Sequence, residues 1–314
     1  MEERFLVTGA NGCIGAWVVA QLTRETTPVV ALDASDDDHR LRLVLDDEAL
    51  AGVTRVKGDI TDLDALERTL DEHAITHVVH LAALQVPFCR ADPPLGARVN
   101  VVGTVNVFEA VARRAERMGP VVYASSIAAY DALDDRGAAP AMQGVPSTLY
   151  GVYKRANEGT ATVYAQERAT ASAGLRPHTV YGPGRDQGLT SAPTTAMLAA
   201  AAGRPYRLPF GGAYQLQYAP DVAQAFIAAA RAHEGGATVR DIGGPPVHTD
   251  ELIAAIEAAA PGAEITYERV ELPFPSDTGD DGAPATPLYA GVADAVGRFR
   301  ELLARGLVAT PGAS

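Results

Sequence analysis

The fold is decided near the start of the chain, by Phe5-Leu6-Val7-Thr8-Gly9-Ala10-Asn11-Gly12-Cys13-Ile14-Gly15. The first three residues predict a short buried strand, and residues 16–22 predict the helix that follows the glycines. Gly9 suits a tight turn, Gly12 a close backbone approach to a pyrophosphate, and Gly15 close packing of helix on strand. Strand, glycine turn and helix in this order predict a dinucleotide bound at the helix N-terminus. We expect it to contact Gly9, Asn11, Gly12, Cys13, Ile14 and Gly15.

A second predicted strand distinguishes this stretch from an ordinary glycine-rich loop. Residues 29–32 are apolar and end at Asp33, which stands 18 residues after Gly15. A carboxylate at that point accepts hydrogen bonds from the ribose hydroxyls and repels a 2′-phosphate, so NAD is preferred over NADP. The acidic run at 36–38 follows, and Arg40 comes only later, which favours the same choice.

Further apolar runs alternate with helical segments along the first half of the chain. Strands are predicted at 54–57, 77–83 and 121–126, and helices at 63–73, 99–117 and 149–168. This alternation predicts an α/β protein with a Rossmann-type doubly wound parallel sheet. At 314 residues the chain also has room for a smaller C-terminal α/β substrate lobe. We expect an NAD-binding domain over 1–175, to which the chain returns near 211–243, and a mainly substrate-binding lobe over 176–314.

The amino-acid composition and net charge limit the kinds of molecule that the protein can bind. Apolar residues make up 47% of the chain and charged residues 21%, which is ordinary for a globular protein. The net charge of −13 argues against nucleic acid or an anionic membrane, because a phosphate-binding surface needs concentrated positive charge. There is no apolar run of about 20 residues and no signal-peptide pattern. Cys13 and Cys89 give neither a disulfide framework nor metal-ligand spacing, so we expect a cytoplasmic protein without a metal.

Lysine occurs only at Lys57 and Lys154, and Lys154 follows Tyr150 by four residues. On a helix this spacing puts the phenol and the ammonium on one face, about one turn apart. The ammonium is expected to favour the phenolate and to lower the pKa of Tyr150 toward the range of an acid/base catalyst.

Several motifs together make the chain similar to a known family. They are Thr8-Gly9-x-x-Gly12-x-x-Gly15, Asp59-Ile60, His80-Leu81-Ala82-Ala83, Asn100, Ser125-Ser126, Tyr150-x-x-x-Lys154 and Arg176-Pro177 before Tyr181-Gly182-Pro183-Gly184. From Phe5 to about Ala230 the chain resembles the extended short-chain dehydrogenase/reductase family of NAD-dependent epimerases and dehydratases. The resemblance implies NAD as cofactor, with Asp59 and Ile60 beside the adenine. It also implies cofactor contacts from Leu81, Ala82, Ala83, Asn100, Tyr150, Lys154 and Pro177.

The resemblance also assigns catalytic roles. Tyr150 is the acid/base, Lys154 holds the nicotinamide ribose and tunes Tyr150, and Ser126 stabilises the oxygen at the reacting carbon. Such a site moves a hydride between the nicotinamide and a carbinol carbon, while Tyr150 takes the hydroxyl proton.

The residues after Ser126 narrow the reaction. Ile127-Ala128-Ala129 fills the gap in which dehydratase and decarboxylase relatives carry carboxylates, which disfavours both reactions. Alcohol oxidation and 4-epimerisation through a transient ketone remain, because both need only the three catalytic residues and the cofactor. A catalytically silent NAD-binding regulator is a hypothesis of a different class.

Two positions favour a small substrate over a nucleotide sugar. Thr179 stands where nucleotide-sugar relatives usually carry an Asn, and Tyr214 where they usually carry an Arg, and both of those residues contact substrate phosphate. Each lost contact costs about 1.5–3 kcal/mol. We therefore expect a dehydrogenase of a small polyhydroxy, sugar-acid or related alcohol substrate, with a sugar or nucleotide-sugar 4-epimerase (UDP-hexose or uronate type) as the alternative.

Substrate contacts are expected at the edge of the cofactor site. Arg185 suits a substrate carboxylate, although a surface ion pair with Asp186 is the alternative role. His178 either meets the substrate or is a structural histidine. The full set of expected substrate contacts is Gln85, Ser125, Ser126, His178, Thr179 and Arg185.

Two other parts of the sequence bear on the oligomeric state and on the mouth of the pocket. In relatives the helices that match 99–117 and 149–168 build a dimer, so we expect a homodimer, although their amphipathic faces also suit burial within one chain. Residues 273–287 are rich in Pro, Gly and Asp and predict either a mobile loop at the pocket mouth or a surface excursion.

Overall fold

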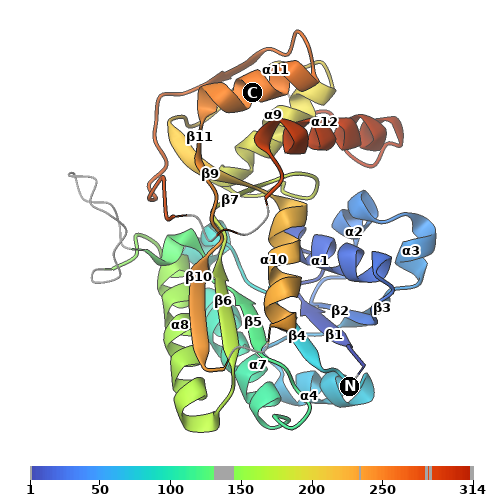
Figure 1. Ribbon diagram of the computed structural model, residues 1–314, viewed down its shortest axis with the longest axis vertical. Helices are drawn as coiled ribbons and strands as arrows, with labels where there is room; N and C mark the ends of the chain where they lie inside the picture. The colour runs from blue at the N-terminus through green and yellow to red at the C-terminus, as the bar shows by residue number, and fades with distance from the viewer. Residues whose placement is uncertain (1, 131–144, 233–234, 280–281, 283–284, 312–314) are drawn as a thin grey trace.

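The computed structural model describes residues 2–130, 145–232, 235–279, 282 and 285–311. Within these residues a seven-stranded parallel sheet forms the larger part, and a smaller lobe lies beyond the carboxyl ends of its strands (Figure 1). In spatial order the strands of the main sheet are β10 (Ala237–Asp241), β6 (Ser172–Arg176), β5 (Val121–Ala124), β4 (His77–His80), β1 (Phe5–Thr8), β2 (Val29–Asp33) and β3 (Thr54–Lys57).

The strand order places a crevice at the centre of this sheet. The chain runs from β1 outward through β2 to β3 and then crosses back to β4 on the other side of β1. In open parallel sheets ligands bind outside the carboxyl ends of the strands where the order reverses in this way. Both motifs that point to a cofactor, the glycine turn after β1 and the residues after β4, lie at this edge.

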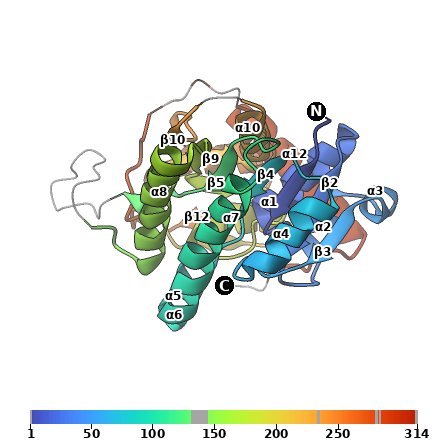
Figure 2. The ribbon, with the colours of Figure 1, turned by 90° about the horizontal axis from the view of Figure 1, so that it is seen from below.

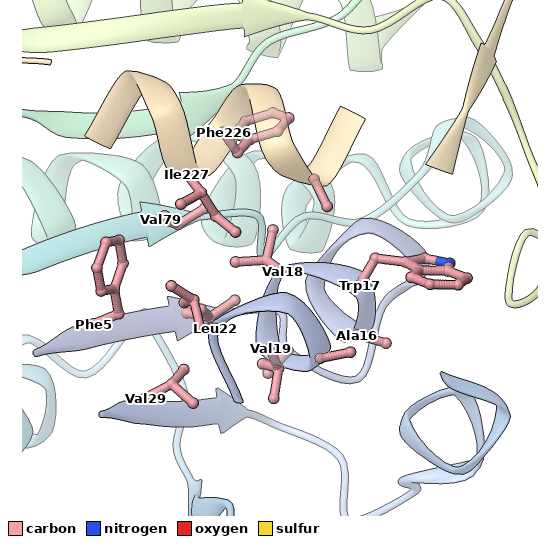
Figure 3. Close-up of a cluster of buried hydrophobic side chains, with 14 of the residues drawn as sticks. Phe5, Ala16, Trp17, Val18, Val19, Leu22, Val29, Val79, Phe226 and Ile227 are labelled. Atoms are coloured by element: carbon pink, nitrogen blue, oxygen red, sulfur yellow. The ribbon is translucent and has the colours of Figure 1, made fainter. Parts of the chain in front are cut away.

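Helices cover both faces of the sheet. Side chains along β1 point alternately to the two faces, and each face carries its own apolar core. Phe5 and Val7 face α1 (Cys13–Arg24) and α10 (Ala219–Arg231), while Leu6 faces the opposite core. Figure 3 shows Phe226 and Ile227 of α10 close to the side chains of α1. Each large side chain buried here stabilises the fold by about 1.5–3 kcal/mol.

The opposite face carries a second layer of helices. Figure 2 shows α4 (Leu63–Glu72), α7 (Gly103–Ala112) and α8 (Leu149–Arg168) side by side across the sheet. A π-helical turn, η1 (Arg98–Val102), leads into α7, so the helix predicted at 99–117 begins with wider turns and ends at Ala112. Short elements link these layers: α2 (His39–Val44), α3 (Asp47–Ala51), α5 (Val86–Ala91), α6 (Pro93–Ala97) and η2 (Ile127–Ala129).

The smaller lobe has its own apolar core. It contains β7 (Thr179–Tyr181), β9 (Ala213–Tyr218) and β11 (Pro246–His248) in one sheet, and β8 (Tyr206–Leu208) and β12 (Ile265–Tyr267) in another. Its helices are η3 (Leu189–Ser191), α9 (Ala192–Ala201), α11 (Thr249–Ala259) and α12 (Leu288–Ala304). Met197, Phe210, Leu252, Ile256 and Phe299 are buried among them.

The predicted α/β fold with a Rossmann-type parallel sheet is confirmed. Two expectations about extent need correction. The strand predicted at 77–83 ends at His80 and the one at 121–126 ends at Ala124, because the residues that follow leave the sheet and line the cavity at its edge. Asp241, inside the expected return of the chain over 211–243, ends β10 of the main sheet. The domain boundary at residue 175 stays a prediction. In the part of the chain that the structure describes, none of the helices has the length and apolarity to cross a bilayer.

Candidate active site

A cavity of about 1040 Å³ opens where the carboxyl ends of the strands meet the smaller lobe. Its size is at the upper end for small-molecule sites. Of the predicted cofactor residues, those that line it are Gly9, Asn11, Gly12, Cys13, Ile14, Gly15, Asp33, Asp59, Ile60, Leu81, Ala82, Ala83, Tyr150, Lys154 and Pro177. The sequence-predicted residues therefore converge on one space, although their contacts with a cofactor stay a prediction.

The glycine turn is packed too closely for side chains at two positions. A Cβ on Gly9, which has φ +69°, would lie 2.6 Å from the backbone nitrogen of Ala82. A Cβ on Gly15 would lie 2.2 Å from the carbonyl oxygen of Gly9. Glycine at both positions lets the N-terminus of α1 reach the cavity, where Cys13 and Ile14 form part of the wall. Backbone N–H groups at such an end attract an anion, so this cradle fits a dinucleotide pyrophosphate.

Asp33 is fixed at the rim of the same cavity. One of its carboxylate oxygens accepts the backbone N–H of Asn11 and the other that of Ser35, both at 3.0 Å. Each oxygen keeps a free lone pair. The carboxylate is thus held ready to accept ribose hydroxyls.

A charged bridge that the sequence did not predict links this rim to the smaller lobe. The Arg40 guanidinium donates to the carbonyl oxygen of Asn11 at 3.1 Å and to both oxygens of Asp186, with a shortest distance of 2.7 Å. His39 also contacts Asp186, at 3.2 Å. This Arg40–Asp186 bridge joins the glycine turn, the segment after β2 and the segment after β7. It also engages the guanidinium that would otherwise be available to a 2′-phosphate, in line with the predicted preference for NAD.

The three candidate catalytic residues come from the end of β5 and the start of α8. Thr148 caps α8 by accepting the backbone N–H of Gly151 at 3.1 Å, which begins the helix just before Tyr150. The Lys154 ammonium lies 5.4 Å from the centre of the Tyr150 ring and donates to the carbonyl oxygen of Ala124 at 2.6 Å. Ser126, two residues beyond β5, lies beside Tyr150 and lines the cavity.

Electrostatics at this site differ from the sequence expectation. Burial raises the pKa of Tyr150 to about 12, while a hydrogen bond with Ser126 and the charge of Arg185 act against that rise. The expected lowering of the Tyr150 pKa by Lys154 is therefore wrong in sign, because removal of the phenol from water outweighs the nearby positive charge. Burial also lowers the pKa of Lys154 to about 8, with Cys89 and Glu158 acting in the opposite direction.

Arg185 lies in the cavity wall and not in a surface ion pair. Its guanidinium donates to the carbonyl oxygen of Gln187 and to the hydroxyl of Thr190, both at 2.7 Å. The alternative role, a pair with Asp186, is wrong, because that carboxylate is engaged by Arg40. Its positive charge acts on Tyr150, so the guanidinium lies close to that phenol.

The other predicted substrate residues divide into two groups. Gln85 lines the cavity at the start of α5. The Ser125 hydroxyl instead donates to Glu158 at 2.5 Å and is buried, so Ser126 is the hydroxyl available beside Tyr150. Ser125 also lines the cavity, and its expected role as fallback for the reacting oxygen stays a prediction.

His178 and Thr179 hold the cavity wall together. The His178 ring lies 3.2 Å from the Thr179 hydroxyl and 2.8 Å from the carbonyl oxygen of Pro275. Burial lowers the pKa of His178, so the ring is neutral and donates to Pro275. This contact fixes the segment that carries Pro273 and Phe274 into the cavity wall. Of the 273–287 segment, Pro273 and Phe274 therefore border the cavity, while residues 280, 281, 283 and 284 lie outside the described residues.

Two motif residues are structural. Asn100 does not line the cavity: its amide accepts the backbone N–H of Leu84 at 2.7 Å and donates to the carbonyl oxygen of the same residue at 2.9 Å. Asn100 thus holds the backbone of the segment after β4 in place. The cofactor contact expected for Asn100 is corrected to this structural role. His80 bridges the hydroxyls of Thr8 at 2.7 Å and Thr104 at 3.0 Å, and burial lowers its pKa to about 3.

Tyr214 does not face the cavity. Its side chain is buried in the core of the smaller lobe, next to Phe210. The expectation that this position reports on a substrate phosphate is therefore not supported by where it lies, and one of the two reasons for preferring a small substrate is removed.

The comparison that decides the family covers most of the chain. The model of the NAD dependent epimerase/dehydratase family matches residues 5–243. The chain belongs to this family. Members of it are NAD-dependent enzymes, which confirms the predicted cofactor and the prediction of an enzyme.

Individual relatives in the family favour the epimerase hypothesis over the small-substrate dehydrogenase. The chain is 33% identical to a UDP-glucose 4-epimerase of Mycolicibacterium smegmatis over 271 residues, 82% of each chain. It is 35% identical to UDP-glucuronate 4-epimerase 2 of Arabidopsis thaliana over 189 residues, 57% of this chain but only 42% of that relative. Among solved structures, MoeE5 in complex with UDP-glucose and NAD is 28% identical, with a TM-score of 0.74 over 96% of this chain and 99% of the other.

Proposed function

We propose that this protein is an NAD-dependent 4-epimerase of an anionic, nucleotide-linked sugar of the UDP-hexose or UDP-uronate type. The observation that carries the proposal is the position of Arg185 beside the Ser126, Tyr150 and Lys154 set. Both of its hydrogen bonds go to neutral oxygens, so these contacts leave its positive charge uncompensated. A phosphate or a carboxylate on the substrate supplies the missing negative charge. The relatives named above support the same substrate class.

The chemistry follows from the residues at the reacting centre. NAD, when bound along the glycine turn and Asp33, supplies a hydride acceptor that also returns the hydride. Tyr150 takes the proton of the C4 hydroxyl and later gives it back, and Ser126 hydrogen-bonds the oxygen in between. Lys154 holds positive charge on the same helix face.

Elimination is disfavoured at this site. Ile127, Ala128 and Ala129 between Ser126 and Tyr130 are buried apolar residues, so this stretch offers no second acid or base. Inversion at C4 requires the hydride to return to the opposite face of the ring, and the keto sugar must therefore turn within the site. A cavity of about 1040 Å³ gives room for this movement.

Product analysis by chromatography tests the proposal. The protein is incubated with NAD and either UDP-glucose or UDP-glucuronate, and each substrate is separated from its 4-epimer. Conversion of one of them supports the proposal, and Tyr150→Phe is expected to slow it by about 10²–10⁴-fold while NAD binding persists. A steady rise of NADH absorbance with a small alcohol, without epimer, would overturn the proposal in favour of the dehydrogenase. Loss of NAD binding in Tyr150→Phe, with no activity toward any substrate, would favour the regulator.

Arg185→Gln separates the two anions. If Arg185 binds a uronate carboxylate, the variant loses turnover of UDP-glucuronate and keeps that of UDP-glucose. If it binds phosphate, turnover of both falls together. Unchanged turnover of both would contradict the role given to Arg185.

We further propose that the protein forms a homodimer through the α8 face. Leu149, Val152 and Val163 of α8 are exposed, as are Leu95 of α6 and Val102 of η1. Exposed apolar side chains gathered on neighbouring helices suit an interface. Sedimentation equilibrium tests this proposal, and a monomer at micromolar concentration would contradict it.

A further inference from the structure

Three successive residues at the end of β5 each contact α8. The carbonyl oxygen of Ala124 accepts the Lys154 ammonium at 2.6 Å, and the hydroxyl of Ser125 donates to Glu158 at 2.5 Å. The third contact is the hydrogen bond between the hydroxyls of Ser126 and Tyr150. The helix residues in these contacts are four positions apart and lie on one face. Strand and helix are thus fixed in register at three points.

Glu158 is the buried charge at the far end of this series. The Arg176 guanidinium donates to both of its carboxylate oxygens at 2.7 Å, and both side chains are almost fully buried. Arg176 also donates to the Tyr130 hydroxyl at 3.2 Å, and that hydroxyl donates to Asp241 at 2.7 Å. Glu158 therefore joins α8 to β5, β6 and β10 at the floor of the site.

Glu158 also differs in charge from the other groups around Lys154. Cys89 on α5 and His80 on β4 face the ammonium, as do Tyr150 and Glu158 from its own helix. Burial raises the pKa of Cys89 and Tyr150 and lowers that of His80, so all three are neutral at pH 8. Cys89 and then Glu158 raise the pKa of Lys154, but the Cys89 thiol is still protonated at pH 8, so Glu158 supplies the negative charge among these described neighbours.

We propose that Glu158 is a positioning residue of the active site, which holds α8 in register with β5 and keeps Lys154 cationic. The inference rests on the role of Lys154 in the proposed function. Glu158, one helical turn beyond Lys154, thereby joins Ser126, Tyr150 and Lys154 as a fourth residue. Unlike a catalytic residue, it supports the reaction without contacting the substrate.

The chain permits a direct test because it has two lysines. With lysine labelled at Cε, carbon NMR of the full chain resolves two signals, and Lys57, whose side chain is 62% exposed, serves as internal reference. Lys154 is expected to titrate near pH 8 in the unaltered protein. The measurement needs no substrate, so a failure of the epimerase assay leaves it readable.

Two variants are expected to shift the titration in opposite directions. Glu158→Gln removes the negative charge one helical turn from Lys154 and should lower the Lys154 midpoint by about one pH unit or more. Arg176→Gln leaves Glu158 unneutralised and should raise it by a similar amount. The double variant should return close to the starting value. Lys57 should not move in any of them.

A purely structural role predicts a different pattern. If the variants only loosen the packing, water reaches Lys154 and its midpoint rises toward 10.5 in both single variants. That result, or no shift in either, would overturn the proposal. Should Glu158→Gln fail to fold by circular dichroism, the Arg176→Gln and double variants decide: a raised midpoint in the first and a restored one in the second support it, and any other pair of values contradicts it.

Discussion

Replacing Asp186 with asparagine removes the carboxylate that ties Arg40 to the segment after β7. In the structure the guanidinium contacts both oxygens of Asp186 and reaches across to the carbonyl oxygen of Asn11 in the glycine turn. The Arg40–Asp186 bridge thus crosses the rim of the cofactor cavity, to which Asn11 and Arg40 both contribute. We expect NAD release to require its opening.

The expected change in the NAD release rate depends on how exposed the side chains of Arg40 and Asp186 are. A charge-assisted pair of this geometry contributes about 1.5–3 kcal/mol when buried. The side chain of Asp186 is 44% exposed and that of Arg40 14%, so solvent screening reduces the contribution. We take about 1 kcal/mol, which corresponds to roughly fivefold faster release, since 1.4 kcal/mol is a factor of ten.

Release can be followed through the single tryptophan. Trp17 lies on α1, directly behind the glycine turn, and energy transfer from it to bound NADH reports occupancy in a stopped-flow displacement by excess NAD. Asp36→Asn is the matched control, because Asp36 lies in the segment after β2 that leads to Arg40 and pairs with Lys57 on the surface. An unchanged release rate in Asp186→Asn, or an equal change in Asp36→Asn, would refute the reasoning.

Four other predictions concern single residues. Gly151→Ala should cost about 1–3 kcal/mol of stability and impair turnover, because its Cβ would lie 2.0 Å from the carbonyl oxygen of Ala128. Gly159→Ala on the same helix meets no atom within 4 Å and should stabilise by about 1 kcal/mol, as denaturant titration can check. His80 has a folded pKa of about 3 against an ordinary 6.5, so the unfolded chain takes up its proton first and stability falls as pH drops through this window. His80→Gln should reduce that loss by roughly 3 kcal/mol between pH 7 and pH 4, seen as a smaller fall in Tm over that range. Tyr150→Phe should slow turnover by about 10²–10⁴-fold at unchanged NAD affinity, and comparable activity in the variant would remove Tyr150 from the mechanism.

The features that the sequence predicted are those that depend on short stretches of chain. The glycine turn brings Gly9 and Gly15 together within seven residues, and the Tyr150–Lys154 pair needs one turn of helix. Residues 149–168 were predicted as a helix with the same bounds that the structure has. Local spacing is sufficient in these cases because backbone geometry alone fixes which side chains meet.

The features that the sequence did not predict depend on contacts between distant segments. Arg40 and Asp186 are 146 positions apart, and His178 and Pro275 are 97 apart, so only the packing of the smaller lobe on the sheet brings them together. In the sequence, Glu158 has the features of an ordinary surface residue of a helix. Its ion pair with Arg176 at the end of β6 is visible only in the structure. The pKa of Tyr150 was mistaken in sign for a related reason, because burial cannot be read from the spacing of two residues.

The late return of the chain to its first sheet has a consequence for biosynthesis. The apolar face of α1, with Trp17 and Leu22, packs under α10, yet residues 25–218 separate the two helices in the chain. A ribosome adding about 5–20 residues per second needs roughly 10–40 s to make that stretch. During translation the first helix therefore waits with its apolar face uncovered, and the nascent polypeptide offers chaperones a binding surface until α10 emerges.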